Sequence, residues 1–211
     1  SARLLGSALG EQTGQVLVAL TPGATGLPAG WRLPAAGAVA TVVDGGPVAV
    51  LLPLPTVSDL RPAGALTAAS LARLPAGSTA GVSRVRRGTA ELPEQWYEAC
   101  AAARVAAAVP RLSPVAHWAE LGAWRLVAAL PGPDPCVVPL LTDPVLTETA
   151  EVFLDGGGSA SKAAGALRVH RQTLYYRLTR IAALTGLDLA DGDDRLLLHA
   201  SLRAARLAPP P

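Results

Sequence analysis

The chain has 211 residues and a formal net charge of only +2, a charge too small to indicate a nucleic-acid partner by itself. Half of its residues are hydrophobic, but no unbroken apolar run approaches the ~18–20 residues that a membrane span needs. The start of the chain lacks the basic and apolar regions of a signal peptide, so we expect a cytoplasmic protein with no membrane partner. Cys100 and Cys136 stand apart from any CxxC or Cys/His cluster, so we expect no metal site.

The first 130 residues predict an α+β domain in which helices pack on an antiparallel sheet. The tight turn Asp44-Gly45-Gly46 lies between two β-rich runs and indicates a hairpin. Pro114 marks the start of the last helix that we expect in this domain. The expected strands are residues 15–20, 38–43, 48–54 and 79–85, and the expected helices are 66–74, 92–108 and 115–130.

A proline-rich joint at residues 131–140 predicts a linker between two domains, because such a run cannot sustain a helix. From residue 141 to residue 211 the pattern is helical throughout. Asp143 followed by Pro144 is typical of a helix start. We expect the next helix to be capped by Ser159 or Ser161, and the last helix to cover residues 195–207.

Residues 159–180 predict a helix-turn-helix, with a short turn at Arg168-Val169 between its two helices. The acidic residues of this region lie on either side of the segment and not within it. A local basic stripe on a nearly neutral chain favours a focused phosphate-binding surface. The basic residues of the segment are Lys162, Arg168, Arg171, Arg177 and Arg180, besides His170.

The second helix, residues 170–184, has one apolar stripe and one polar face. The stripe recurs at i, i+4 and i+7, which predicts packing on the preceding helices; its members are Leu174, Leu178 and Ile181. An amide can pair with adenine, a guanidinium with guanine or phosphate, and a phenol can reach phosphate. The candidate reading residues on the polar face are Gln172, Thr173, Tyr176 and Arg180.

The two helix N-termini add further candidates for contacts with double-stranded DNA. His170 and Arg171 stand at the end that a helix-turn-helix inserts deepest into the major groove. Ser161 and Lys162 open the first helix, where backbone N–H groups and the helix dipole favour a phosphate. The sequence therefore predicts that helix 170–184 reads DNA and that the first helix anchors a phosphate.

Several of these residues have a purely structural alternative. Arg177 lies close to the apolar stripe, so an ion pair with Glu148 or Glu151 competes with a phosphate contact. His170 is also suited to capping the helix, and Tyr175 to covering the bundle. The whole segment could also be a solvated helix pair with a chance excess of arginine.

The segment from Gly158 to Ile181, with Leu184-Thr-Gly-Leu-Asp-Leu after it, closely resembles the C-terminal domain of PucR/CdaR-family regulators. The family pattern, "A..L.vHrnTL.yRL.ri..ltG.dl", is matched at nearly every fixed position, with Gln172 where asparagine is usual. This resemblance implies a bacterial, sequence-specific transcriptional regulator. We expect a homodimer, because two joined helix-turn-helix units reach useful specificity. The helix also resembles that of Fis-type proteins, which leaves a non-specific architectural DNA-binding protein as an alternative.

In that family the preceding domain is usually a degenerate relative of the GGDEF cyclase fold. Gly81-Val-Ser, the helix 92–108 and the run from His117 to Gly122 resemble its landmarks. A cyclase needs carboxylates at the hairpin to hold metal ions, whereas Pro47 to Val50 follow Asp44-Gly45-Gly46 here. We therefore expect no catalytic residue, no cofactor and no enzyme, with a residual nucleotide-processing activity as the alternative. A small-molecule effector of unknown identity is expected as a further partner.

Overall fold

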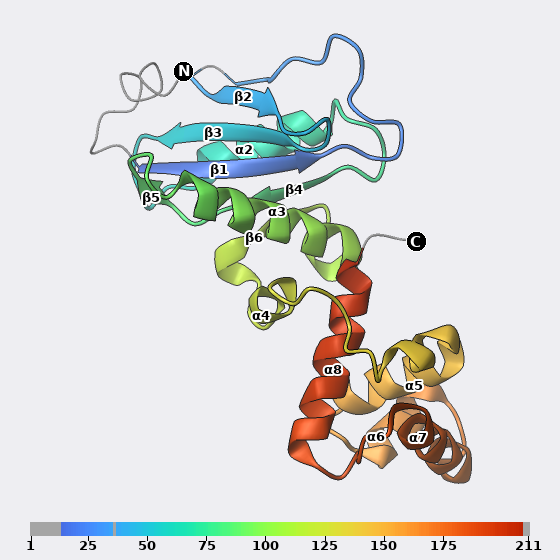
Figure 1. The fold of residues 1–211 in the computed structure, drawn as a ribbon. Coiled ribbons are helices and arrows are strands. Elements are labelled where there is room, and N and C mark those ends of the chain that lie inside the picture. The colour runs from blue at the N-terminus through green and yellow to red at the C-terminus, as the bar shows by residue number, and fades with distance from the viewer. Residues whose placement is uncertain (1–13, 36, 209–211) are drawn as a thin grey trace. The chain divides into compact units, whose positions relative to one another are not determined.

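The computed structural model describes residues 14–35 and 37–208, which form two compact units (Figure 1). The first unit is Ser1–Arg125 and the second is Leu126–Pro211. Residues 1–13, on which the expected absence of a signal peptide rests, lie outside the described residues. Among the described residues, no helix is both long and apolar enough to cross a membrane.

The first unit is built on one six-stranded sheet of order β2-β3-β1-β4-β6, with β5 paired to β1. The strands are β1 (Gly14–Thr21), β2 (Val39–Val42), β3 (Val48–Leu54), β4 (Thr79–Val82), β5 (Arg86–Arg87) and β6 (Val115–His117). All pairs are antiparallel except β4 with β6, which are parallel. The α+β fold class is confirmed, and the sheet is mixed at this edge because a helical crossover joins β4 to β6.

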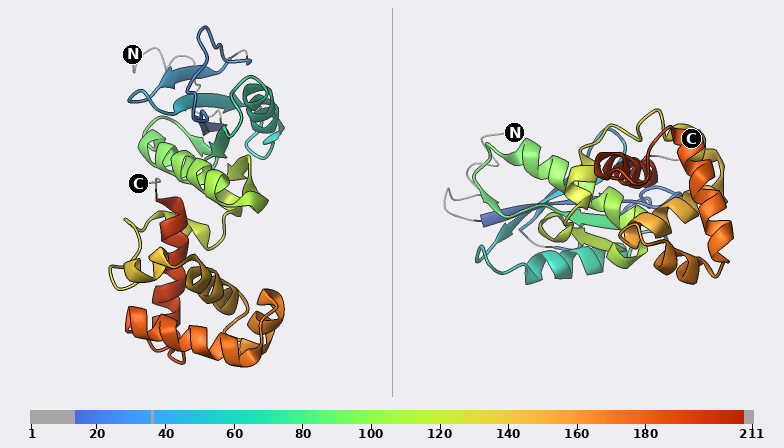
Figure 2. Two further views of the ribbon diagram at one scale, coloured as in Figure 1. Left: turned by 90° about the vertical axis from the view of Figure 1, so that its right-hand side faces the viewer. Right: turned by 90° about the horizontal axis from the view of Figure 1, so that it is seen from below.

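Two helices cover opposite faces of this sheet, α2 (Arg61–Leu71) on one and α3 (Leu92–Ala108) on the other (Figure 2). The strict alternation of side chains along β1 explains this arrangement. Val16, Val18 and Leu20 pack in the same cluster as Ala63 and Leu66 of α2. The intervening residues Leu17 and Ala19 pack with Ala99 and Ala103 of α3.

The helix expected at residues 115–130 is wrong. Val115 instead pairs with Ala80 and begins β6, since this run extends the open edge of β4. A 3-10 helix, Trp118–Glu120, follows, and Gly122 then takes a φ of 58° that a continuous helix excludes. Within this range, only the short α4 (Trp124–Ala128) is α-helical. The helix expected at 66–74 begins earlier, because Pro62 occupies the first turn of α2.

The second unit is a helical bundle with a leucine-rich core (Figure 1). Its elements are a 3-10 helix (Val138–Thr142), α5 (Pro144–Asp155), α6 (Ala160–Leu167), α7 (Arg171–Thr185) and α8 (Gly192–Leu207). Residues 131–140, expected as a linker, contribute Val137 and Leu140 to this core, where both are fully buried. α8 begins before the expected residue 195, because Asp191 caps it by accepting from the backbone N–H groups of Asp193 and Asp194.

Candidate nucleic-acid interface

The helix-turn-helix consists of α6, α7 and the turn between them. Arg168 ends α6 in the left-handed conformation, and the backbone N–H of Val169 donates to the carbonyl of Ala164 at 3.1 Å. His170 then caps α7, its Nδ1 accepting from the backbone N–H of Gln172 at 3.3 Å. Ser159, and not Ser161, caps α6 by accepting from the N–H of Lys162 at 3.4 Å. These local contacts fix where the second helix starts.

The apolar stripe predicted for α7 is confirmed. Leu174 and Ile181 are fully buried and Leu178 is 9% exposed. They pack in one cluster with Phe153 of α5 and Ala163 of α6. Because three turns of α7 are anchored in the core, its opposite face is presented to solvent in a fixed orientation.

That opposite face carries the predicted reading residues. Tyr176 is 65% exposed, a large fraction for an aromatic side chain. The exposed residues of this face are Arg171, Gln172, Thr173, Tyr175, Tyr176, Thr179 and Arg180. The structure therefore gathers an amide, four hydroxyl-bearing side chains and two guanidinium groups on one exposed surface.

Arg177 is the candidate that lies apart from this surface. Its side chain is half-buried, and the guanidinium donates to the hydroxyl of the buried Thr149 on α5 at 3.2 Å. The predicted partner Glu151 is bound by Arg206 instead. Arg177 therefore ties α7 to α5, and its contact with DNA stays a prediction.

Positive charge is distributed unevenly over the second unit. On α8, Arg203 binds Asp155 at 2.8 Å and Arg206 binds Glu151. Partial burial raises the pKa of the Asp155 carboxyl, but hydrogen bonds from Arg203 and His199 outweigh this and hold the pKa below its ordinary value. Those arginines are thus neutralised by their acidic partners.

The cations of the helix-turn-helix have no such neutralisation. Lys162, Arg168, Arg171 and Arg180 are all exposed and make no salt bridge within the described part of the chain. Ser161 is exposed beside Lys162 in the first turn of α6. Uncompensated positive charge around one helix face attracts a polyanion and steers its approach.

The hairpin of the first unit carries a single carboxylate. Asp44 and Gly45 take positive φ values of 49° and 69° in the turn between β2 and β3, where Asp44 is exposed. Val48 and Val50 of β3, where a cyclase would need carboxylates, are buried at 2% and 0% exposure. The turn prediction is confirmed, and the likeness to a GGDEF domain stays a prediction.

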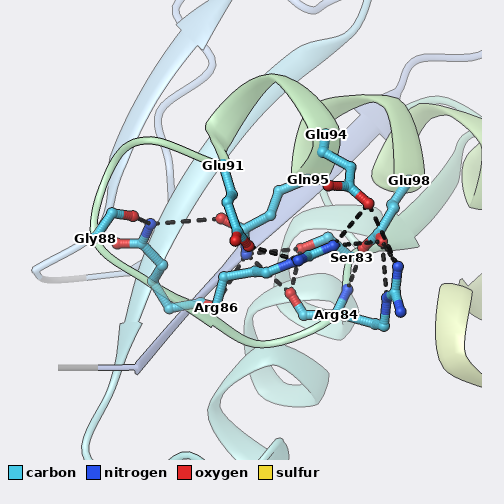
Figure 3. Close-up of polar contacts among 9 residues, drawn as sticks. Ser83, Arg84, Arg86, Gly88, Glu91, Glu94, Gln95 and Glu98 are labelled. Carbon is cyan, nitrogen blue, oxygen red and sulfur yellow. Dashed lines mark hydrogen bonds and ion pairs between the residues drawn. The ribbon is translucent and has the colours of Figure 1, made fainter. Parts of the chain in front are cut away.

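A polar cluster in the first unit was not predicted from the sequence (Figure 3). Glu98 of α3 is 1% exposed and accepts from the backbone N–H and the Nε of Arg84, both at 2.8 Å, and from Arg86 at 3.2 Å. Gln95 is fully buried and donates to the carbonyl of Arg84 at 2.9 Å. The spacing of Glu91, Glu94 and Glu98 on one helix face, after a run of arginines, was the available signal. The cluster fixes the start of α3 against the segment after β4.

The first unit also has an apolar hollow of about 350 Å³ beside α3. Leu17 and Leu51 form part of its floor, and Trp96 lines it from the first turns of α3. Val39 and Thr41 of the edge strand β2 line its other side. An effector site in this unit stays a prediction.

Two helices joined by a short turn, the second one anchored by an apolar stripe and exposing a basic face, define a helix-turn-helix DNA-binding domain. Comparison with known families agrees, because residues 146–204 match the PucR C-terminal helix-turn-helix domain. Residues 146–204 therefore form a helix-turn-helix domain of the PucR C-terminal type.

Two named relatives are similar to part of this chain. The carbohydrate diacid regulator of Escherichia coli K12 is 63% identical over 38 residues, which are 18% of this chain and 10% of that protein. The transcriptional activator PmfR of Paenarthrobacter nicotinovorans is 41% identical over 70 residues, 33% of this chain and 14% of that protein. The similarity thus spans a small part of these relatives.

Among solved structures, the crystal structure of a regulator of polyketide synthase expression from Bifidobacterium adolescentis is similar over 92% of this chain and 80% of that chain. The sequence identity is 22% and the TM-score is 0.37.

Proposed function

We propose that this chain is a sequence-specific regulator of transcription that reads the major groove of double-stranded DNA with α7. The observation that carries the proposal is the exposed face of Arg171, Gln172 and Arg180, which no carboxylate of the described residues neutralises. A helix with buried leucines on one side and such donors on the other suits insertion between two phosphate backbones. A bacterial protein with this function would act in the cytoplasm.

The residues divide by the contacts that we propose for them. Gln172, Thr173 and Arg180 suit base edges, because an amide or guanidinium can make two hydrogen bonds to one base. Ser161 and Lys162 suit a phosphate at the N-terminus of α6. His170, Tyr176 and Arg177 suit the flanking backbone, with His170 already engaged as a helix cap.

We propose that the regulator acts as a homodimer on a two-fold symmetric site. One α7 helix reads only a few base pairs, and two related by symmetry place their reading faces about 34–36 Å apart, one turn of DNA. DNA geometry supports this proposal, together with the single helix-turn-helix found among the residues that the structure describes.

The test is selection of duplexes from a random pool with the whole chain, followed by gel shifts of the selected duplex. We expect Gln172→Ala and Arg180→Ala each to weaken binding by about 1–3 kcal/mol. Arg73→Ala removes an exposed arginine of the first unit and should leave binding unchanged. Unaltered affinity in both α7 variants would remove the assignment of this face.

The same experiment separates the proposed regulator from an architectural DNA-binding protein. A specific regulator prefers its selected duplex over a scrambled duplex at one salt concentration, whereas an architectural protein binds both equally. We propose no catalytic activity, in keeping with Val48 and Val50 at the hairpin. Conversion of GTP or ATP by the pure protein with magnesium would contradict that part of the proposal.

A further inference from the structure

Arg171 and Tyr175 form a defined pair at the start of α7. The phenol oxygen of Tyr175 accepts from Nη2 of Arg171 at 3.0 Å and from its Nε at 3.3 Å. The central carbon of the guanidinium lies 5.4 Å from the centroid of the tyrosine ring. Both side chains are exposed, so burial in the bundle does not account for the arrangement.

The pair has a consequence for which atoms of Arg171 remain available. Residues four apart share a helix face, so the contact costs no distortion of α7. A planar guanidinium has two edges that can each make paired hydrogen bonds. The phenol occupies the edge formed by Nε and Nη2, which leaves the edge formed by Nη1 and Nη2 open.

An open guanidinium edge at the N-terminus of a recognition helix matches one base in particular. Guanine presents O6 and N7 side by side in the major groove, and a paired contact from arginine is the commonest specific contact. Arg171 forms no salt bridge within residues 37–208 that would compete for this edge. Arg177, by contrast, is held on Thr149 in the bundle.

We propose that Tyr175 is a positioning residue that holds Arg171 with its free edge directed to a guanine of the operator half-site. The proposal rests on the proposed function and gives a role to Tyr175, which the sequence left open between a place beside the polar face and covering the bundle. Holding a long side chain in advance of binding lowers the entropy lost on complex formation. Tyr175 thereby acts on base preference through Arg171, without contacting DNA itself.

The test is a double-mutant cycle with the whole chain and two duplexes, one selected from a random pool by the wild type and one of scrambled sequence. Tyr175→Phe keeps the ring and removes the phenol oxygen. We expect it to weaken binding of the selected duplex by about 3–30-fold and to leave the scrambled duplex unchanged. In the Arg171→Ala background, Tyr175→Phe should have no further effect. Tyr97→Phe, at a tyrosine of similar exposure in the first unit, is the matched control.

Two results would overturn the proposal. An equal loss from Tyr175→Phe with and without Arg171 would mean that the phenol contacts DNA directly. An equal loss on both duplexes would mean that the pair serves a phosphate. If the wild type itself shows no preference for the selected duplex, the proposed regulator function is wrong. The wild-type protein alone gives this result, so it is distinguishable from a failure of the Tyr175 proposal.

Discussion

Arg168 occupies the left-handed region of backbone space, with a φ of 54°, in the turn between α6 and α7. This conformation costs a residue with a side chain about 1–2 kcal/mol, and glycine adopts it freely. The strained position carries an exposed cation three residues before α7 begins. A phosphate contact by this side chain is a reason for arginine at a place where glycine fits better.

The prediction for Arg168→Gly is that fold stability and DNA binding change in opposite directions. The free energy of unfolding of the second unit should rise by up to about 1 kcal/mol as the backbone strain is relieved. DNA affinity should fall for all sequences alike, and the salt dependence should weaken by about one ion. Gel shifts at several salt concentrations measure the second effect. Arg168→Asn, which removes the charge and tolerates the conformation, should match the binding loss; full affinity in both variants would refute the phosphate contact.

At the scale of single elements, the caps of the second unit decide where helices begin. Asp191 accepts from the backbone N–H groups of Asp194 and Asp193 at 3.0 and 2.9 Å, and these hydrogen bonds hold the pKa of its carboxyl below the ordinary value. A carboxyl with a lowered pKa in the folded state stabilises the fold above its unfolded pKa of about 3.9. That contribution is lost as the pH falls through the folded pKa.

Asp191→Asn should therefore reduce the protection of α8 amides from hydrogen exchange near neutral pH. Asparagine still caps a helix but does not titrate, so the difference between wild type and variant should vanish on acidification, once Asp191 is protonated. Asp193→Asn removes the same charge from the first turn without altering the cap and should have a smaller effect. A difference that persists in acid would show that the charge of Asp191 is not its cause.

Elements with strong local signals were predictable from the sequence. α3 was expected at residues 92–108 and is found there, and Asp143 with Pro144 marks the start of α5. α7 follows from its stripe and from Gly186, which ends it with a φ of 73°. The prediction of a helix at residues 115–130 was wrong because Val115 pairs with β4, a strand distant in sequence. The buried ion pairs of Glu98 likewise depend on how α3 packs against the segment after β4, which the spacing of the glutamates alone does not specify.

The candidate site shows the same limit at the level of side chains. The exposed polar face of α7 was predictable from helical periodicity, which is a local property. The hydrogen bond of Arg177 to Thr149 depends on how α5 packs across α7. Periodicity alone allowed either a phosphate contact or an ion pair with one of two glutamates. Arg171 and Tyr175 are close in sequence, but their hydrogen bond depends on the rotamers of both side chains. Helical periodicity does not specify rotamers.

At the scale of the whole molecule, the two units have separate cores. The first is built around the sheet and the second around the leucines of α5 to α8. At Gly81 of β4, an added Cβ would lie 2.0 Å from the carbonyl oxygen of Ala99 and 2.3 Å from the N–H nitrogen of Ala103. Both are backbone atoms of α3, so α3 packs directly on this strand and has no flexible side chain that could give way.

Gly81→Ala should accordingly destabilise the first unit by about 1–3 kcal/mol and leave the protection of amides in α5 to α8 unchanged.

The same variant tests which unit holds the proposed dimer together. If the first unit holds two copies together, affinity for a two-half-site duplex should fall while affinity for a single half-site stays at the wild-type level. If the second unit holds them together, both affinities should be retained. Gly64→Ala adds the same methyl group on α2 with open space around it and is the matched control. Exposure of α7 amides in Gly81→Ala and not in Gly64→Ala would contradict the separation of the two cores.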